Sequence, residues 1–376
     1  MSHLNYLEKL LDGVEVEWKD LGEVTQYEQP TKYLVKTKNY DDSFETPVLT
    51  AGKTFILGYT DEIDGINRAS ENPVIIFDDF TTANKWVDFD FKAKSSAMKM
   101  IKSSDESKFM LKYVYYWMNT LPSDLIDGDH KRQWISNYCV KKIPIPCPDN
   151  PEKSLAIQSE IVRILDKFTA LTAELTAELN MRKKQYNYYR DKLLSFEEGE
   201  VEWKTLGEIC ESITSGKNKD KSETGKFPVY GSTGVIGRTN TKAYEIEQIL
   251  VARVGANAGR VNIASGKYDV SDNTLILKVK NKYNLKFLYY YLVNLNLNRF
   301  VKGAGQPLLT AGQLKAMVIP VPMPEEQSRI VSILDNFDII TNSITEGLPR
   351  EIELRQKQYE YYRDLLLSFP KSDEAA

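Results

Sequence analysis

The clearest pattern of apolar and polar positions runs from about residue 153 to 196 and has a helical period. Its first apolar residues follow steps of three and four: Ile161, Ile164, Phe168, Leu171 and Leu175. This spacing is typical of a coiled-coil seam. A further step of four reaches Leu179 and forms a stutter, after which the rhythm resumes through Tyr186, Tyr189 and Leu193. The segment predicts one long helix whose apolar stripe needs a partner.

A second segment, about 325–369, repeats this rhythm. Its seam residues are Ile330, Ile333, Phe337, Ile340 and Ile344, with Tyr362 near the end. Gly347 and Pro349 lie inside the segment and predict a kink or a break. Because neither helix can bury its seam alone, we expect the two to pair antiparallel, with a globular domain towards each end and pseudo-twofold symmetry. The alternative is two independent helices, each packed on its own domain.

The segments before each helix, about 13–150 and 199–324, are rich in β-branched residues, aromatic residues, glycine and turn formers. Four stretches predict strands: 74–77, 97–101, 249–252 and 274–278. One helix is expected in each segment, at 112–117 and 286–291. The predicted fold class is therefore α+β, with two α/β domains in tandem, separated and followed by long helices.

Four sequence blocks occur twice, in the same order. They are Val16–Glu23 and Val201–Glu208, Ile143–Pro146 and Ile319–Pro322, Gln158–Phe168 and Gln327–Phe337, and Gln185–Asp191 and Gln358–Asp364. Internal repeats of this kind indicate a tandem duplication. Between the blocks the two copies differ almost completely, so matching blocks flank segments of unlike sequence.

The repeats set the expected domain boundaries. These are an N-terminal helical segment (1–12), a first domain (13–150), a first spacer helix (151–198), a second domain (199–324), a second spacer helix (325–369) and a tail (370–376). The stretch Tyr6–Leu11 is similar to Tyr189–Leu194, so we expect it to pack beside the end of the C-terminal helix.

Composition narrows the class of protein. The chain has 376 residues, 42% hydrophobic and 27% charged, which is typical of a soluble protein with at least two domains. No apolar run is long enough to span a membrane, and the first residues lack the apolar stretch of a signal peptide. Cys139, Cys147 and Cys210 have no metal-ligand spacing and predict free thiols in a reducing cytoplasm.

The sequence contains only partial matches to catalytic motifs. Gly52-Lys53-Thr54 is similar to the end of a phosphate-binding loop, but Pro47 stands where the first glycine would be. Glu17 and Lys19 have a nuclease-like spacing with no acidic partner at a convincing distance. The only histidines are His3 and His130, too few for most general-base schemes. We therefore expect a binding protein and no enzyme, with no metal and no cofactor.

Basic, amide and aromatic residues gather in loop-like stretches of both domains. The net charge of −4 argues against nucleic-acid binding only weakly, because the placement of positive charge matters more than its total. In the first domain the candidates are Lys53, Thr82, Asn84, Lys85, His130, Lys131, Arg132 and Gln133. In the second they are Lys217, Lys219, Arg238, Asn240, Arg253, Asn257, Arg260 and Gln306. Lys and Arg neutralise phosphates, while Arg, Asn, Gln and His can contact base edges.

The repeated openings, exits, helix starts and helix ends, together with the tandem tetrapeptide Thr172–Leu179, resemble those of Type I restriction–modification specificity subunits over essentially the whole chain. The IC-like subclass is the most similar. The resemblance implies that the two domains are target-recognition domains, each reading one half of a bipartite, asymmetric site in double-stranded DNA. One departure is the shorter second domain.

The same resemblance implies partners. Two methyltransferase subunits would dock on the helices, and restriction/translocase subunits would join them, so that adenine methylation and DNA cleavage occur on partner subunits. S-adenosylmethionine, ATP and Mg would be used by those partners, and this chain would bind none of them. Ile161, Phe168, Leu175, Leu179, Tyr189, Ile330, Phe337, Ile344 and Tyr362 are the spacer and partner-helix residues expected from the seam.

Two other functions stay open from the sequence alone. One is a structural coiled-coil scaffold that joins two protein-binding domains. The other is a stand-alone nuclease or methyltransferase, which the missing motifs disfavour.

Overall fold

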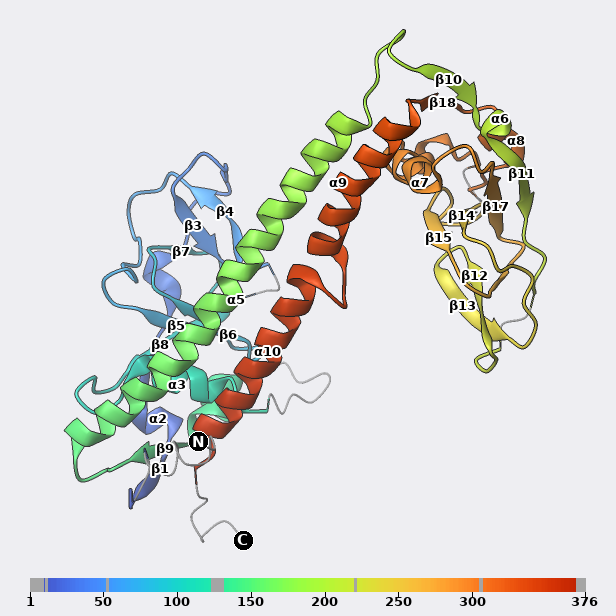
Figure 1. Cartoon of the computed structure of the whole chain (residues 1–376). Helices are drawn as coiled ribbons and strands as arrows, with labels where there is room; N and C mark the ends of the chain where they lie inside the picture. Colours follow the sequence, from blue (N-terminus) through green and yellow to red (C-terminus); the bar gives the residue numbers. More distant parts are fainter. Residues whose placement is uncertain are drawn as a thin grey trace. The chain divides into compact units, whose positions relative to one another are not determined.

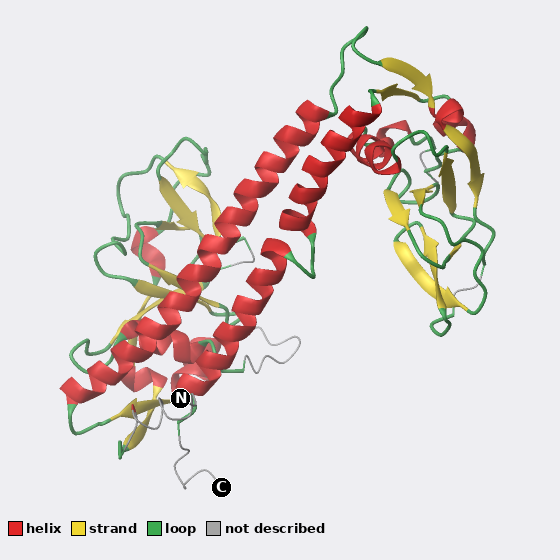
Figure 2. Cartoon of the chain, viewed as in Figure 1, coloured by secondary structure: helices red, strands yellow, loops and turns green. Residues whose placement is uncertain are grey.

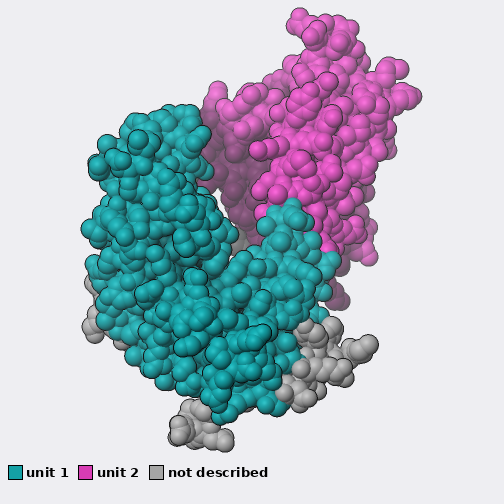
Figure 3. Space-filling model, turned by 90° about the vertical axis from the view of Figure 1, so that its left-hand side faces the viewer, with its two compact units in different colours: residues 1–174, 353–376 teal, residues 175–352 magenta. Residues whose placement is uncertain are grey.

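The computed structural model describes residue 10 and residues 13–51, 54–122, 132–219, 222–303 and 307–369. It divides into two compact units, one of residues 1–174 with 353–376 and one of residues 175–352 (Figure 3). Each unit holds one domain and a share of the long helices. Lys53, His130, Lys131, Gln306, the tail and all of the N-terminal segment except Leu10 lie outside the described residues.

Domain 1 contains two sheets. The four-stranded sheet is antiparallel and has the order β2 (Thr25–Glu28), β8 (Met98–Ser103), β5 (Val74–Asp78), β6 (Asn84–Val87). The three-stranded sheet has the order β4 (Ile56–Thr60), β3 (Thr46–Leu49), β7 (Lys92–Ala93), and β3 runs parallel to β7. The central strand β5 is buried along its whole length, as its apolar run predicts.

Domain 2 repeats this topology with a different sequence. Its four-stranded sheet has the order β11 (Cys210–Ser215), β17 (Thr274–Val279), β14 (Gln248–Ala252), β15 (Val261–Ala264). Its three-stranded sheet has the order β13 (Gly234–Thr239), β12 (Phe227–Gly231), β16 (Asp269–Val270), again with one parallel pair. The prediction of two tandem α/β domains is confirmed, and Figure 2 shows that the strands lie in these two domains.

The first and last strands of each domain form a separate two-stranded sheet, which we call the frame pair. In domain 1 it consists of β1 (Val16–Asp20) and β9 (Lys142–Pro146), and in domain 2 of β10 (Glu202–Thr205) and β18 (Val318–Val321). Trp18 lies opposite Pro144, and Trp203 lies opposite Pro320. The repeated openings and the Ile-Pro exits are therefore partners in one antiparallel ladder.

A short helix follows the first strand of each frame pair, α2 (Leu21–Val24) or α6 (Leu206–Ile209). In domain 2 a capping box starts it, because Thr205 and Glu208 satisfy each other's backbone N–H groups at 2.8 and 3.3 Å. The predicted helix of each domain is present as α3 (Leu111–Met118) and α7 (Leu285–Asn294). The helices α4 (Gln133–Ser136) and α8 (Ala311–Lys315) were not predicted.

The first spacer is one helix, α5 (Pro151–Leu193), which starts in unit 1 and ends in unit 2 (Figure 1). The second spacer is two helices, α9 (Pro324–Asn342) and α10 (Gly347–Leu366). The break expected near Gly347 is confirmed, because Gly347 has a φ of +74° and an added Cβ would collide with the carbonyl oxygen of Ile339. Ile344 was expected in the seam, but it lies in this break and is 79% exposed.

The helices pair within each unit, which excludes independent packing. In unit 1 the first half of α5 lies against α10, and Phe168 stacks on Tyr362 with ring centroids 5.0 Å apart. In unit 2 the second half of α5 lies against α9, where Tyr189 stacks on Phe337 at 5.8 Å. In both units the chain directions are antiparallel (Figure 1). The seam spacing therefore predicted the partners correctly.

Candidate nucleic-acid interface

Each domain is fixed to its spacer helix by the same three kinds of side chain. In unit 1 Asp166 of α5 accepts hydrogen bonds from Lys112 Nζ at 2.9 Å and from Tyr116 OH at 2.6 Å. In unit 2 Asp335 of α9 accepts from Lys286 Nζ at 2.7 Å and from the Tyr290 hydroxyl at 2.7 Å. We call these two sets of contacts the domain–helix contacts.

The tyrosines of the domain–helix contacts act as permanent donors. Burial and then the neighbouring Asp166 raise the pKa of Tyr116 far above its usual range, and burial and then Asp335 do the same for Tyr290. These residues were not predicted from the sequence, although both aspartates belong to the repeated Ile-Leu-Asp blocks and both Lys–Tyr pairs have a spacing of four.

A buried glutamine reinforces each domain–helix contact. Gln158 of α5 accepts from the backbone N–H of Met110 at 2.8 Å and donates to the Lys108 carbonyl at 2.9 Å. Gln327 of α9 accepts from the backbone N–H of Asn284 at 3.0 Å. These bonds hold the starts of α3 and α7, so the frame fixes how each domain sits on its own helix.

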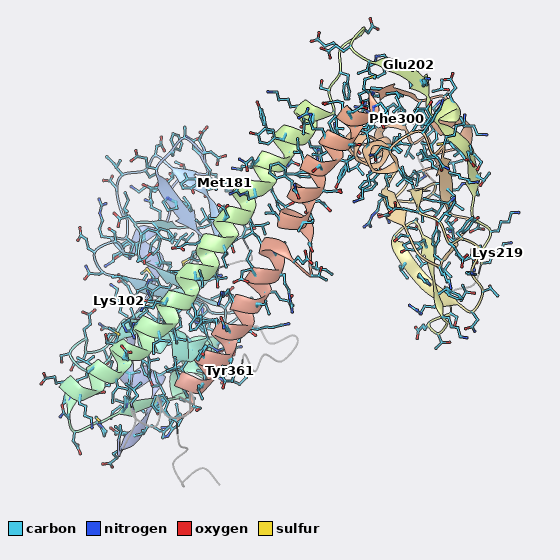
Figure 4. The ribbon with its side chains drawn as sticks, viewed as in Figure 1. Lys102, Met181, Glu202, Lys219, Phe300 and Tyr361 are labelled. Carbon is cyan, nitrogen blue, oxygen red and sulfur yellow. The ribbon has the colours of Figure 1, made fainter. Side chains whose placement is uncertain are left out.

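The loops of domain 2 converge at one end of its four-stranded sheet. The backbone N–H of Arg253, just after β14, donates to the Asn273 carbonyl at 3.0 Å, and the Arg253 carbonyl accepts from Leu309 at 2.8 Å. The loop after β11 joins them, because Asn218 donates its backbone N–H to the Val270 carbonyl at 3.0 Å. Lys217, Lys219 and Arg253 thus belong to one cluster of loops, and Figure 4 shows Lys219 at the rim of this domain.

Arg253 is held firmly within this cluster. Its Nη1 donates to Ser215 Oγ at 2.9 Å, and its Nε is buried without an acceptor among the described residues. Arg260, at the other end of the same β14–β15 loop, is exposed beside a recess of about 290 Å³ that Asn257, Asn296 and Asn298 also line. This recess offers amide and guanidinium donors together.

The remaining candidates of domain 2 lie on its three-stranded sheet. Arg238 is exposed on β13, but its Nε and Nη2 donate to the carbonyls of Gly225 and Lys226 at 2.7 and 3.1 Å. Asn240 follows the same strand and is exposed. Arg238 therefore stabilises its own hairpin and has only part of its guanidinium left for a phosphate.

In domain 1 the candidates separate into exposed and buried residues. Lys85 on β6 is exposed, and Asn84 beside it is half-buried. Thr82 is buried in the β5–β6 turn with a φ of +60°, and its backbone N–H donates to the Asp78 carbonyl at 2.9 Å. Gln133 is buried at the start of α4. Burial removes Thr82 and Gln133 from the residues that can reach DNA in this conformation.

A basic loop of domain 1 carries Lys36 and Lys38, which are both exposed and were not predicted as site residues. The carboxylate of Glu62 fixes this loop by accepting from the backbone N–H groups of Lys36 and Thr37 at 2.8 and 2.9 Å. The buried Lys92 forms an ion pair with Glu62 at 2.8 Å. Burial alone would raise the pKa of Glu62, but these partners together lower it to about 2.

Several large apolar side chains of the helices are exposed. Met181 on α5 is 55% exposed and Tyr361 on α10 is 58% exposed (Figure 4). In unit 2 a pocket of about 780 Å³ lies between the end of α5 and the start of α9, and Arg182, Tyr189, Arg329 and Phe337 are among its lining residues. Exposed apolar side chains beside charged ones are typical of protein–protein contact sites.

The described part of the chain contains no group of three or more His, Cys, Asp or Glu side chains placed to hold a metal ion. None of its helices has the length and apolar character needed to cross a membrane. Burial raises the pKa of the Cys210 thiol to about 12, which makes it a poor nucleophile.

The chain is similar to proteins of a single family. The family model described as the Type I restriction modification DNA specificity domain matches residues 13–182 and 198–354. The chain is 60% identical to the Type I restriction enzyme EcoR124I/EcoR124II specificity subunit of Escherichia coli, over 99% of each chain. It is 37% identical to the EcoprrI specificity subunit of Escherichia coli, over 92% of this chain and 93% of that one.

Solved structures show the same fold. The crystal structure of a Type I restriction–modification S subunit from M. genitalium covers 96% of this chain and 98% of its own, with a TM-score of 0.65 and 18% identity. A structure from a study of the assembly and conformational transition of the type I R-M system covers 94% of this chain and 97% of its own, with a TM-score of 0.54 and 17% identity.

Proposed function

Because this chain belongs to the family of Type I restriction–modification DNA specificity subunits, we propose that it reads a bipartite, asymmetric DNA site. By reading that site it directs adenine methylation and DNA cleavage by partner subunits. The chain is the DNA-recognition component of its system and not a catalytic one. Its DNA contacts would come from the loop ends of the two domains.

One observation carries this proposal: two domains of identical topology have different residues at the corresponding turn, between β5 and β6 in domain 1 and between β14 and β15 in domain 2. Because the two domains share their topology and their domain–helix contacts, the loop end of each domain, which we call its reading surface, would be placed in the same way on its own helix. Different side chains on that surface would select different bases. Two such surfaces in one chain account for a site with two unlike halves.

The helices supply the proposed docking surfaces for partners. Each unit carries a pair of antiparallel helices with exposed apolar side chains, so we assign one methyltransferase subunit to each unit. Restriction/translocase subunits would join the complex through the methyltransferases. S-adenosylmethionine, ATP and Mg would be bound by these partners in the cytoplasm, and this chain would bind no cofactor.

The continuous helix α5 is also proposed to set the gap between the half-sites. The tandem tetrapeptide Thr172–Leu179 lies in the middle of α5, at the point where the chain passes from unit 1 to unit 2. Half-sites read from one face of the duplex lie roughly 34–36 Å apart. A helical segment of fixed length between the two domains can therefore act as a ruler.

The test is co-expression with the methyltransferase subunit of the same system, followed by genome-wide mapping of modified adenines by single-molecule sequencing. We expect one split, asymmetric motif with a fixed gap. A control with an inactive methyltransferase should show no modification. If the active, soluble complex modifies nothing and shows no salt-dependent binding to DNA, the chain is a scaffold and the proposal is wrong.

A further inference from the structure

The inner strands β5 of domain 1 and β14 of domain 2 occupy the same place in their four-stranded sheets. The residue that directly follows is Asp79 after β5 and Arg253 after β14. Asp79 donates its backbone N–H to the Ala97 carbonyl at 3.1 Å and accepts from the backbone N–H of Gln133 at 2.8 Å. Arg253 makes the same two bonds: its backbone N–H donates to the Asn273 carbonyl at 3.0 Å, and its carbonyl accepts from the backbone N–H of Leu309 at 2.8 Å. The two residues therefore occupy one position of the shared frame, with opposite charge.

Buried polar atoms without hydrogen-bond partners gather at this strand end in both domains. Among the described residues of domain 1 they are Gln29 Oε1, Asn84 Oδ1, and Asp79 Oδ2 and Lys99 Nζ, which form an ion pair with each other but no hydrogen bond. In domain 2 they are Arg253 Nε, Ser271 Oγ and Thr274 Oγ1, and one further such atom, the Tyr40 hydroxyl, lies elsewhere in domain 1. Such atoms are rare in folded proteins because leaving them unpaired is unfavourable. Most of these atoms lie at the corresponding strand end of the two domains, which points to a site kept for function.

In domain 2 the structure holds Arg253 ready for a ligand. Both of its backbone groups are bonded, and Ser215 fixes one side of its guanidinium. Within the described residues no other side chain or backbone oxygen accepts from its Nη atoms. A guanidinium held in this way matches the O6 and N7 acceptors of guanine in the major groove.

In domain 1 the corresponding residue cannot touch DNA, because Asp79 is 0% exposed. Its Oδ1 accepts from the backbone N–H of Trp134 at 3.0 Å. Its Oδ2 lies 3.4 Å from Nζ of the equally buried Lys99 and 3.9 Å from Nη1 of Arg132, which is 47% exposed. The carboxylate therefore lies between a cation in the core and a guanidinium at the surface.

We propose that this strand end is the base-recognition centre of both domains, which fill it in different ways. Domain 2 supplies the guanidinium of Arg253 directly. Domain 1 supplies the guanidinium of Arg132, and Asp79 and Lys99 are positioning residues that hold it. The inference rests on the proposed function: each guanidinium contacts one guanine, and the two guanines lie in different half-sites.

Four variants of the complete complex test domain 1, with the methylated motif as the readout. Arg132→Ala should reduce discrimination at one position of one half-site by about 5- to 150-fold and leave the other half-site unchanged. Arg132→Lys should not restore it, because an ammonium cannot form the bidentate contact. Asp79→Asn should relax the same position as Arg132→Ala. The matched control is Arg68→Ala, an exposed arginine of the same domain paired with Asp90, which should leave the motif intact.

Asp79→Asn leaves Lys99 buried and uncompensated, so the double variant Asp79→Leu/Lys99→Met removes both charges together. This variant should fold, as thermal melting will show, and should relax the same position. The inference is overturned if Arg132→Ala leaves the motif intact or weakens all sequences alike. It is also overturned if the folded Asp79 variants keep full discrimination. A wild-type complex with no split motif would instead contradict the proposed function itself.

Discussion

At the scale of single residues, Glu62 connects a buried charge with an exposed basic loop. Its folded pKa of about 2 is below the unfolded value, so its stabilising effect is fully present above about pH 4.5 and is lost as the pH falls through about 2. We expect Glu62→Gln to lower the free energy of unfolding by about 2–3 kcal/mol at neutral pH.

Urea unfolding of the wild type and of Glu62→Gln between pH 2 and 7 checks this prediction. The difference between the two should shrink towards the acid end. Glu71→Gln, which changes an exposed carboxylate of the same domain, is the control and should cost little at any pH. A pH-independent difference between wild type and Glu62→Gln would show that packing and not charge is responsible.

Arg253 gives a second prediction at this scale. Arg253→Ala should relax one position of one half-site at a cost of about 1–3 kcal/mol, because a base contact carries sequence information. Binding measured against a panel of single-base variants at several salt concentrations provides the check. Uniform weakening with a smaller salt slope would identify a phosphate contact instead.

Sequence alone selected Arg253 because it stands between a strand and a glycine-rich loop. It also selected Thr82 and Gln133, which are buried. The reason is physical: loop residues have no periodicity that separates inward from outward side chains. Asp79 was not selected either, because its contacts are with Lys99 and Trp134, which are distant in the sequence.

At the scale of elements, the apolar periodicity predicted the long helices and their partners, and the β-branched runs predicted the central strands. The three-stranded sheets were missed. Their strands β7 and β16 have only two residues each, and each pairs in parallel with a strand distant in sequence. Elements this short leave no sequence pattern, because their stability comes from tertiary contacts.

The ruler in α5 leads to a prediction at the element scale. Inserting Thr-Ala-Glu-Leu after Leu179 lengthens the helix by about 6 Å and rotates it by about 40° beyond a full turn. One base pair turns DNA by about 35°. The modified motif should therefore keep both half-sequences and gain a longer gap. A motif with altered half-sequences and the original gap would contradict the ruler.

At the scale of the whole molecule, the net charge of −4 coexists with DNA recognition because positive charge is placed in loops. We expect the frame to make the two domains exchangeable. Leu21 donates its backbone N–H to the Lys141 carbonyl at 2.9 Å, and Leu206 donates to the Met317 carbonyl at 2.7 Å. Residues 21–141 and 206–317 thus begin and end at equivalent hydrogen bonds.

Replacing residues 21–141 by a copy of residues 206–317 should give a chain that reads one half-sequence twice. The pseudo-twofold relation expected from the repeats predicts that the two copies in the methylated motif are inverted. Single-molecule sequencing of the co-expressed complex measures this directly. A direct repeat would contradict the twofold, and an unchanged asymmetric motif would show that specificity lies outside the exchanged residues.

The two frame pairs also have a consequence for inheritance. Short matching amino-acid blocks flank each reading domain, since the Val-Glu-Trp-Lys openings and the Ile-Pro exits occur twice. A genetic exchange with its crossover points in these blocks would move an entire domain, and the crossover points would fall in strands that find an equivalent ladder partner. A new pair of half-sites would in this way arise in one genetic event, with the frame pairs and the helices unchanged.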